Sequence, residues 1–301
     1  MQGEKRFAAF AALIGGVVAV GWSAIFVRWT EMPGVSSAFY RMLIASFVMW
    51  GILMVQRGHP RKIDAQVIPL AFLGGVFFAA DVGFFNVAVM HTEAGSATFL
   101  GNNAPVVVGL LTWAITRKLP SGRFWLALAL AVVGGALIVS IDWGRLRSAS
   151  GADMIAVAAS VAFALYLVAT ERLRTIADTT TIVTLSATAS AAALLVFALF
   201  GHISLAVPGL HPLLACVGLG IICQVAGYWF LTYALGHLPA TVSSVVMLGV
   251  APITAILAYF LFGEAMTPVQ LLGGALILAA VWMISHPTGK GEGDRDQGAT
   301  E

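Results

Sequence analysis

The chain has 301 residues, of which 59% are hydrophobic and only 10% are charged, with a mean hydropathy of +0.93 and a net charge of +2. A soluble domain carries about 25% charged residues, so this composition cannot cover a water-facing surface and indicates an integral membrane protein. The small net charge gives no reason to expect a nucleic-acid partner.

The apolar runs predict membrane helices from one end of the chain to the other. The first run follows Lys5 and Arg6, as in a signal peptide, but it continues to Val27 without a small-residue cleavage site, so we expect it to be retained. A transmembrane helix needs about 20 mostly apolar residues. This criterion predicts ten spans, at 7–28, 35–55, 67–90, 94–116, 123–141, 152–171, 180–200, 211–235, 240–262 and 267–285.

The Lys and Arg residues of the predicted loops set the orientation, because cytoplasmic loops are enriched in them. One side of the ten spans collects twelve of these residues: Lys5, Arg6, Arg57, Arg61, Lys62, Arg117, Lys118, Arg123, Arg172, Arg174, Lys290 and Arg295. The other side collects Arg28, Arg145 and Arg147. We therefore expect both termini in the cytoplasm, together with a disordered tail over 287–301 that is rich in glycine and acidic residues.

Motifs of the first half of the chain recur in the second. Three pairs of segments align: AVMHTEA (88–94) with ALGHLPA (234–240), NNAPVVVGLLTW (102–113) with GVAPITAILAYF (249–260), and GWSAI (21–25) with AFALY (162–166). Each half holds five predicted helices, and an odd number makes the two copies enter the membrane in opposite directions. Inverted repeats of this kind are typical of secondary transporters. The fold class we predict is all-α, with ten transmembrane helices in two inverted five-helix repeats, at 1–148 and 149–286.

Ten spans in two halves, with Trp22 in the first span and these Pro-centred blocks, resemble the drug/metabolite transporter (DMT) superfamily in its EamA-type branch. The resemblance covers about 7–286, and its most specific piece is APITAILAYFLFGE (251–264). Within the superfamily the chain is similar to the YddG-type amino-acid exporters. The resemblance implies a multi-pass exporter of the bacterial inner membrane, with a central cavity lined by spans 1, 3, 4, 6, 8 and 9.

Motifs of enzymes and primary pumps are missing from the sequence. It contains no G-x-x-x-x-G-K-[ST] phosphate loop, no H-E-x-x-H and no G-x-S-x-G. The histidines fall at predicted helix ends on both sides of the membrane, and Cys216 and Cys223 lie too far apart on one helix for a disulfide. We therefore expect no enzyme activity, no metal and no cofactor, and transport driven by a gradient.

Two charged residues fall inside predicted spans at similar depth, Asp81 in the third and Arg41 in the second. Intramembrane charges usually pair with each other, so a structural Asp81–Arg41 ion pair is one interpretation. The other makes Asp81 a proton-coupling group or the partner of a substrate ammonium group. The sequence leaves both open.

Other polar and aromatic residues inside the spans are candidates for the cavity wall. Gln224 and Tyr228 lie one turn apart on span 8, where they either face the cavity or join neighbouring helices by hydrogen bonds. Trp22 and Tyr166 occupy near-equivalent positions of the two repeats. We expect an apolar wall for the substrate from Trp22, Phe85, Tyr166, Tyr228 and Met247.

The stretch FLGNNAPVVVG (99–109) combines what the repeats share with what they do not. Pro105 and Pro252 are repeat-equivalent, and each is expected to kink its span and free a carbonyl one turn earlier. Asn102 and Asn103 have no counterpart in the second half, so the shape of the repeat does not require them. We expect one of the two to contact substrate.

Alternating access of a small metabolite near the membrane midplane is the predicted mechanism. The first expectation for the substrate is an amino acid, neutral or aromatic, and the expected partners are this substrate and the lipid bilayer, with the protein a monomer. An exporter of drugs or cationic compounds with the same fold, and a channel, remain as alternatives. A carrier of nucleotide sugars or phosphate would need several cations facing the cavity, whereas only Arg41 lies well inside a span.

Overall fold

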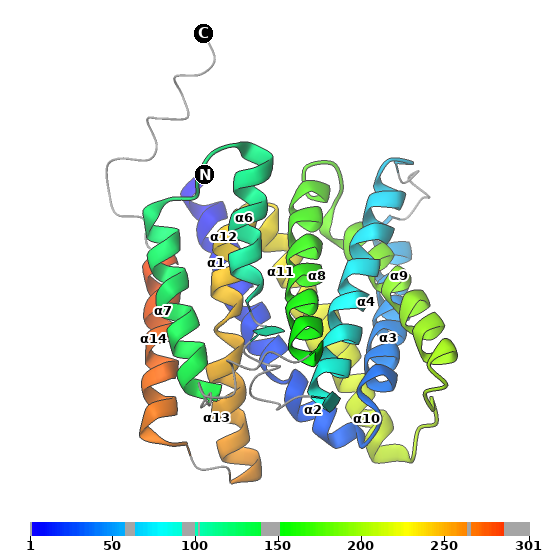
Figure 1. Cartoon of the computed structure of the whole chain (residues 1–301). Coiled ribbons are helices and arrows are strands. Elements are labelled where there is room, and N and C mark those ends of the chain that lie inside the picture. Colours follow the sequence, from blue (N-terminus) through cyan, green and yellow to red (C-terminus); the bar gives the residue numbers. More distant parts are fainter. Residues whose placement is uncertain are drawn as a thin grey trace.

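The structure, a computed structural model, describes residues 2–57, 64–91, 100–101, 103–139, 151–263 and 266–285. Every regular element in these ranges is a helix (Figure 1). In chain order the helices are α1 (Gln2–Gly21), α2 (Ser23–Thr30), α3 (Gly34–Arg57), α4 (Val67–His91), α6 (Ala104–Thr116), α7 (Gly122–Val139), α8 (Gly151–Leu173), α9 (Thr179–Phe200), α10 (Leu210–Gly218), η2 (Leu219–Tyr228), α11 (Trp229–Leu235), α12 (Ala240–Met247), α13 (Val250–Phe262) and α14 (Pro268–Ser285).

The helical stretches match the predicted spans. Eight of them are long and apolar enough to cross a membrane, and two shorter apolar helices, α6 and α7, take the places of the fourth and fifth spans. The expected all-α fold with ten apolar segments is confirmed. The first part of the fourth span and the tail lie outside the described residues, as does Asn102.

The ninth span is interrupted where the sequence predicts a kink. α12 ends at Met247 and α13 begins at Val250, with Leu248 and Gly249 in a turn between them. Pro252 has no N–H to donate to the Leu248 carbonyl one turn earlier, and this carbonyl accepts the N–H of Ala251 instead, at 3.2 Å. In the fourth span Asn103 is the N-cap of α6, with Pro105 in the first turn.

Two further irregularities are not predicted by the sequence. The first span breaks at Trp22, between α1 and α2, where the Thr254 hydroxyl donates a 2.8 Å hydrogen bond to the Gly21 carbonyl. The eighth span contains ten π-helical residues, Leu219–Tyr228. Long π-helical turns are rare and are frequent at functional sites.

The contacts between helices follow a pseudo-twofold relation between the two halves. The pairs α3–α9, α7–α14 and α6–α12 each join equivalent spans of the two repeats. The pair α4–α8, spans 3 and 6, has its counterpart in the contacts of α1 with η2 and α11, spans 1 and 8. α1 and α8 start at opposite ends of the bundle (Figure 1). These contacts are those of two five-helix halves of opposite orientation.

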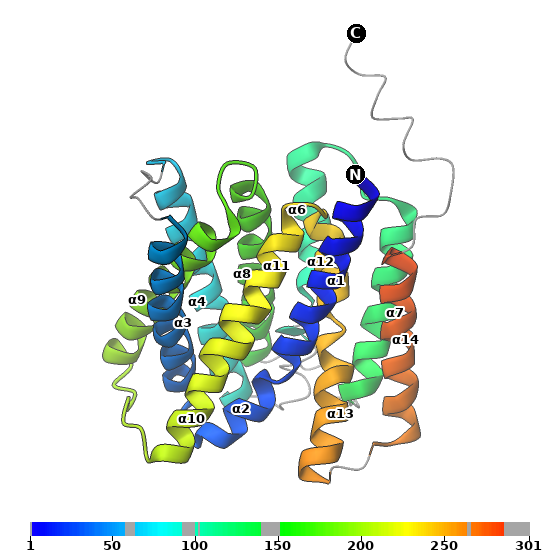
Figure 2. The same cartoon turned by 180° about the vertical axis from the view of Figure 1, so that it is seen from behind.

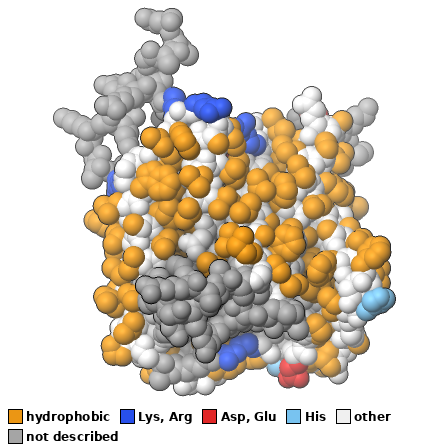
Figure 3. All heavy atoms as spheres, in the orientation of Figure 1, with side chains coloured by type: hydrophobic (Ala, Val, Ile, Leu, Met, Phe, Trp, Pro, Cys, Tyr) orange, Lys and Arg blue, Asp and Glu red, His pale blue; other side chains and the backbone are white. Residues whose placement is uncertain are grey.

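The two ends of the bundle differ in charge. We call the end at which α1 begins the amino face and the opposite end the far face (Figure 2). Exposed Lys and Arg side chains gather at the amino face, above an apolar flank (Figure 3). The exposed basic residues described near the amino face include Lys5, Arg6, Arg117, Lys118 and Arg172, whereas Arg28 lies near the far face.

Glycine permits a close approach between the two halves at the contact of α7 with α14. A Cβ atom on Gly134 of α7 would lie 2.5 Å from the Gly273 carbonyl oxygen, and one on Gly273 of α14 would lie equally close to the Gly134 oxygen. Such reciprocal contact of small residues lets helix backbones pack tightly in a membrane.

The variant Gly134→Leu is expected to destabilise the protein by about 1–3 kcal/mol, because the added side chain must push α7 and α14 apart. The measurement is the thermal unfolding midpoint in detergent. The control is Gly51→Leu on α3, where an added Cβ meets nothing within 4 Å and the residue is exposed. Equal midpoints for the two variants would contradict the expectation.

Candidate functional site

A cavity of about 890 Å³ lies between the two repeats. Its lining comes from both halves: α1, α2, α3, α4, α6 and α7 of the first, and α8, η2, α12 and α13 of the second. Spans 2 and 5 therefore contribute besides the six that the resemblance implied. A volume of this size is in the range of small-molecule sites, which are mostly apolar with a few polar groups.

The cavity runs from the middle of the bundle toward the far face. Its lining includes Arg28, which is exposed near the end of α2, and Gly34, the first residue of α3. Its deep end is aromatic. The Phe78 ring lies 4.8 Å from that of Tyr228 and 5.0 Å from that of Tyr166, centroid to centroid, with Phe163 6.1 Å from Tyr166. Phe78, Tyr228 and Phe163 line the cavity, whereas Tyr166 is buried behind Phe78.

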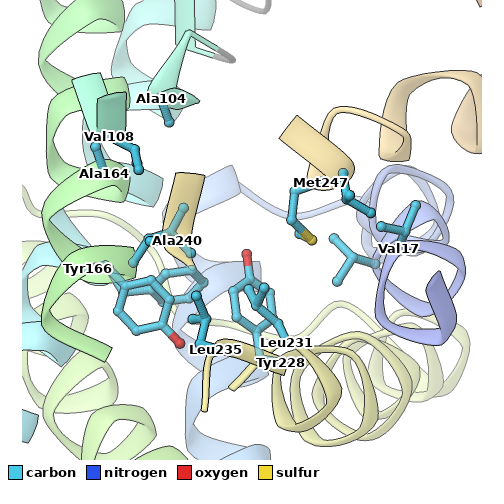
Figure 4. Packing of buried hydrophobic residues seen from close by; sticks show 14 of the residues in the cluster. Val17, Ala104, Val108, Ala164, Tyr166, Tyr228, Leu231, Leu235, Ala240 and Met247 are labelled. Atoms are coloured by element: carbon cyan, nitrogen blue, oxygen red, sulfur yellow. The ribbon is translucent and has the colours of Figure 1, made fainter. Parts of the chain in front are cut away.

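On the amino side of this aromatic cluster the two halves are packed together. Buried side chains of α1, α6, α8, α11 and α12 belong to the packed cluster between the halves, part of which is drawn in Figure 4. Leu13, Leu231 and Leu235 are at most 3% exposed, and Leu238 and Ala240 in the turn into α12 are also buried. The described part of the chain thus has a closed amino side and a cavity on the side of the far face.

Arg41 lies in the cavity lining, about 10 Å along α3 from its start at the far face. Its Nε donates a hydrogen bond to Gln224 Oε1 at 2.9 Å, and its Nη1 donates one to Ser23 Oγ at 3.1 Å. The guanidinium carbon lies 5.3 Å from the centre of the Tyr228 ring, within cation–π distance. Side chains of α2 and η2 therefore hold the guanidinium in place.

Asp81 also lines the cavity, on α4, and lies near enough to Arg41 for electrostatic attraction. The sequence left open a structural ion pair between the two residues. Arg41, however, directs its two hydrogen bonds to Gln224 and Ser23. Asp81 is thus a carboxylate of the cavity wall with the Arg41 guanidinium nearby. The deep end of the same cavity is mainly aromatic and apolar.

The structure brings most of the predicted site residues to the cavity, but not all. Asp81, Phe85, Asn103, Tyr228 and Met247 line it, together with Arg41 and Pro105. Trp22, Tyr166, Gln224 and Pro252 are not in the lining. Trp22 packs beside Phe26, with ring centroids 5.9 Å apart, and Gln224 is 4% exposed and accepts the hydrogen bond of Arg41. The predicted wall thus has fewer members than expected, and Gln224 contacts the site through Arg41.

Three residues of the site carry no signal in the sequence. Ser23 is a small polar residue beside the break at Trp22, and its hydroxyl accepts a hydrogen bond from Arg41. Phe78 and Phe163 look like ordinary apolar residues of spans 3 and 6, and only the pairing of α4 with α8 brings their rings together. An alignment of the two repeats identifies equivalent spans, but it does not predict which side chains of neighbouring spans are in contact.

The sequence model of the EamA-like transporter family matches this chain twice, over residues 7–140 and 150–286. The chain belongs to the EamA-like transporter family. The two matches cover nearly all of this transporter, one over each predicted repeat, and the cavity between the repeats is where secondary transporters of this plan hold their substrates.

Relatives of this transporter carry transporter names. YwfM of Bacillus subtilis (strain 168), an uncharacterised transporter, is 30% identical over 82% of each chain. An uncharacterised transporter of Archaeoglobus fulgidus is 25% identical over 90% of this chain and 94% of its own. A probable terminal-alkyne amino-acid exporter of Streptantibioticus cattleyicolor is 26% identical over 81% of this chain and 80% of its own.

The fold of this transporter is also present in a solved crystal structure. The two superpose with a TM-score of 0.75 at 16% sequence identity, over 91% of this chain and 95% of the other. At this identity the likeness concerns the fold alone.

Proposed function

We propose that this transporter exports amino acids with apolar or aromatic side chains by alternating access. The observation that carries the proposal is the cavity between the repeats, in which Arg41 and Asp81 place opposite charges beside an aromatic and apolar wall. An amino acid has the same combination of groups, two opposite charges and a side chain. The relative from Streptantibioticus cattleyicolor, a probable amino-acid exporter, supports the same substrate class.

The charge distribution supports one orientation of the protein in the membrane. The basic residues gathered at the amino face support a cytoplasmic position for that face, by the positive-inside rule. The cavity then faces the outside, and the packed side chains of the amino side close the cytoplasmic route. Alternating access requires the reverse arrangement as its second state, in which the two halves rock about the substrate. Asn103 and Met247, at the ends of interrupted helices, lie where such rocking would change the lining.

The test is reconstitution of the purified protein in liposomes loaded with labelled phenylalanine, leucine or alanine. We expect saturable efflux, and faster exchange when unlabelled amino acid is present on both sides. Flux that rises linearly with concentration would indicate a channel. Saturable flux of lipophilic cations without any flux of amino acids would indicate a drug exporter and would overturn the proposal.

Filling the cavity should stop transport without unfolding the protein. Ala255 of α13 lines the cavity and is half-buried, so a tryptophan at this position would occupy part of the space that the substrate needs. We expect Ala255→Trp to lower flux at least tenfold, with a thermal unfolding midpoint within a few degrees of the parent. The control, Ala275→Trp on the exposed side of α14, should keep its flux. Full flux in Ala255→Trp would show that substrate does not pass through this cavity.

A further inference from the structure

Three side chains fix the orientation of the Arg41 guanidinium in the cavity wall. Gln224 fixes Nε, Ser23 fixes Nη1 and the Tyr228 ring lies alongside the guanidinium group. Gln224 and Tyr228 belong to the eighth span and Ser23 to the first, so two helices besides α3 define the plane in which the guanidinium lies. A positive charge oriented in this way presents the remaining N–H groups in a fixed direction.

Part of this guanidinium has no partner. Nη2 is buried and makes no hydrogen bond to any described residue. A buried donor without an acceptor is costly, and more so when it is charged. Structural arginines inside membranes are usually paired with an acid or with backbone carbonyls. Asp81 is close, yet it receives neither of the two hydrogen bonds that Arg41 makes.

We propose that Arg41 binds the carboxylate of the transported amino acid, and that Gln224 and Ser23 are the positioning residues that orient it. The proposal rests on the proposed function and deepens it. A planar guanidinium can meet a carboxylate with two parallel hydrogen bonds, which a lysine ammonium group cannot do. With Asp81 taking the ammonium group, the site selects substrates that carry both charges and discriminates against amines and amino-acid amides.

The burial of Nη2 implies that binding of a carboxylate requires a change in the conformation of the cavity lining. Because Nη2 is shielded from water in this state, a carboxylate reaches it only after the lining has shifted around the substrate. The contact therefore strengthens as the cavity closes, and substrates without a carboxylate should be bound in the open cavity but translocated slowly. A purely structural role, in which Arg41 joins α3 to α2 and η2, would instead affect every substrate alike.

The experiment compares three competitors against labelled leucine uptake into proteoliposomes: phenylalanine, phenylalaninamide and phenethylamine. The parent protein should prefer phenylalanine over both analogues at least tenfold. In Arg41→Gln this preference should fall below twofold while inhibition by the two analogues stays as in the parent, and Arg41→Lys should fall between. Gln224→Leu should raise the KM for phenylalanine while the inhibition by phenylalaninamide stays unchanged, because Arg41 keeps its charge but loses its orientation.

The matched control is Ser46→Ala, which removes the hydrogen bond of α3 to Thr188 of α9 away from the cavity and should keep the parent's preference. A tenfold preference for phenylalanine that survives in Arg41→Gln, or in Gln224→Leu should Arg41→Gln fail to fold, would overturn the proposal, as would a parent protein without any preference. Failure of the proposed function looks different, because the parent would then show no saturable leucine flux.

Discussion

The variant Asp81→Asn is expected to lower the uptake of phenylalanine and leucine into proteoliposomes at least tenfold. Asp81 is an acid of the cavity wall, and an ammonium group that enters an apolar cavity needs a counter-charge there. A hydrogen bond to a charged group contributes about 1.5–3 kcal/mol, which corresponds to roughly a tenfold to more than a hundredfold change in affinity. Asparagine keeps the size and the polarity but removes the charge.

The assay separates binding from coupling. If Asp81 binds the ammonium group, net flux and exchange both fall in Asp81→Asn. If Asp81 carries a coupled proton instead, exchange of amino acid persists while net flux loses its dependence on pH. The control is Asp64→Asn, since Asp64 is exposed in the loop before α4 at the amino face. Full transport with unchanged pH dependence in Asp81→Asn would leave Asp81 only a structural role.

The sequence predicts the spans of this protein well, because the bilayer imposes one requirement on every helix. A run of apolar residues about 20 long has few alternatives to crossing the membrane, and the predicted boundaries agree with the helices to within a few residues for eight spans. The interruption before Pro252 is also predictable, since it follows from a missing N–H. The break at Trp22 is not, because the hydroxyl that bonds to the Gly21 carbonyl there lies on α13, more than 230 residues away.

The site is predictable only in part, for the same reason. A charged residue inside a span is unusual, so the sequence identifies Asp81 and Arg41. It does not predict which side chains each of them contacts. Similar depth allowed a contact between these two but could not predict that Arg41 bonds to Gln224, 183 residues along the chain. The π-helical segment that carries Gln224 and Tyr228 has no sequence signature, so the angle at which the two side chains leave their helix could not be derived.

The two ends of the bundle differ in one helix-capping contact, although the repeats are related. On the amino side, Glu171 at the end of α8 accepts a 3.0 Å hydrogen bond from the N–H of Ala240, the first residue of α12. The N-cap residue Pro239 offers no side-chain bond, so Glu171 caps α12 from another helix. The alignment of GWSAI with AFALY places Thr30 opposite Glu171, and the Thr30 hydroxyl donates to the Val27 carbonyl of its own helix.

Arg174 completes this arrangement. Its Nε donates to the Thr232 carbonyl near the end of α11, and its Nη1 donates to the Ala177 carbonyl. An acid at the start of α12 and a base at the end of α11 both match the helix dipoles. The turn between α11 and α12 is therefore held at both ends by the last turn of α8 and the residue that follows it, and we expect these contacts to help keep the amino side closed.

The variant Glu171→Ala should open this side. The lost hydrogen bond involves a charged group and contributes about 1.5–3 kcal/mol to the closed state, so the open population should rise roughly tenfold or more. The measurement is the rate at which a membrane-impermeant thiol reagent labels Leu238→Cys, a buried position in this turn, from the amino face with both native cysteines replaced by alanine. Glu171→Gln keeps an acceptor and should label more slowly than Glu171→Ala, while Arg172→Ala, an exposed neighbour, should label as the parent does.

Because a carrier that stays open on one side cannot cycle, net amino-acid flux should fall in Glu171→Ala as labelling rises. Unchanged labelling would mean that the packed apolar side chains alone close the amino side.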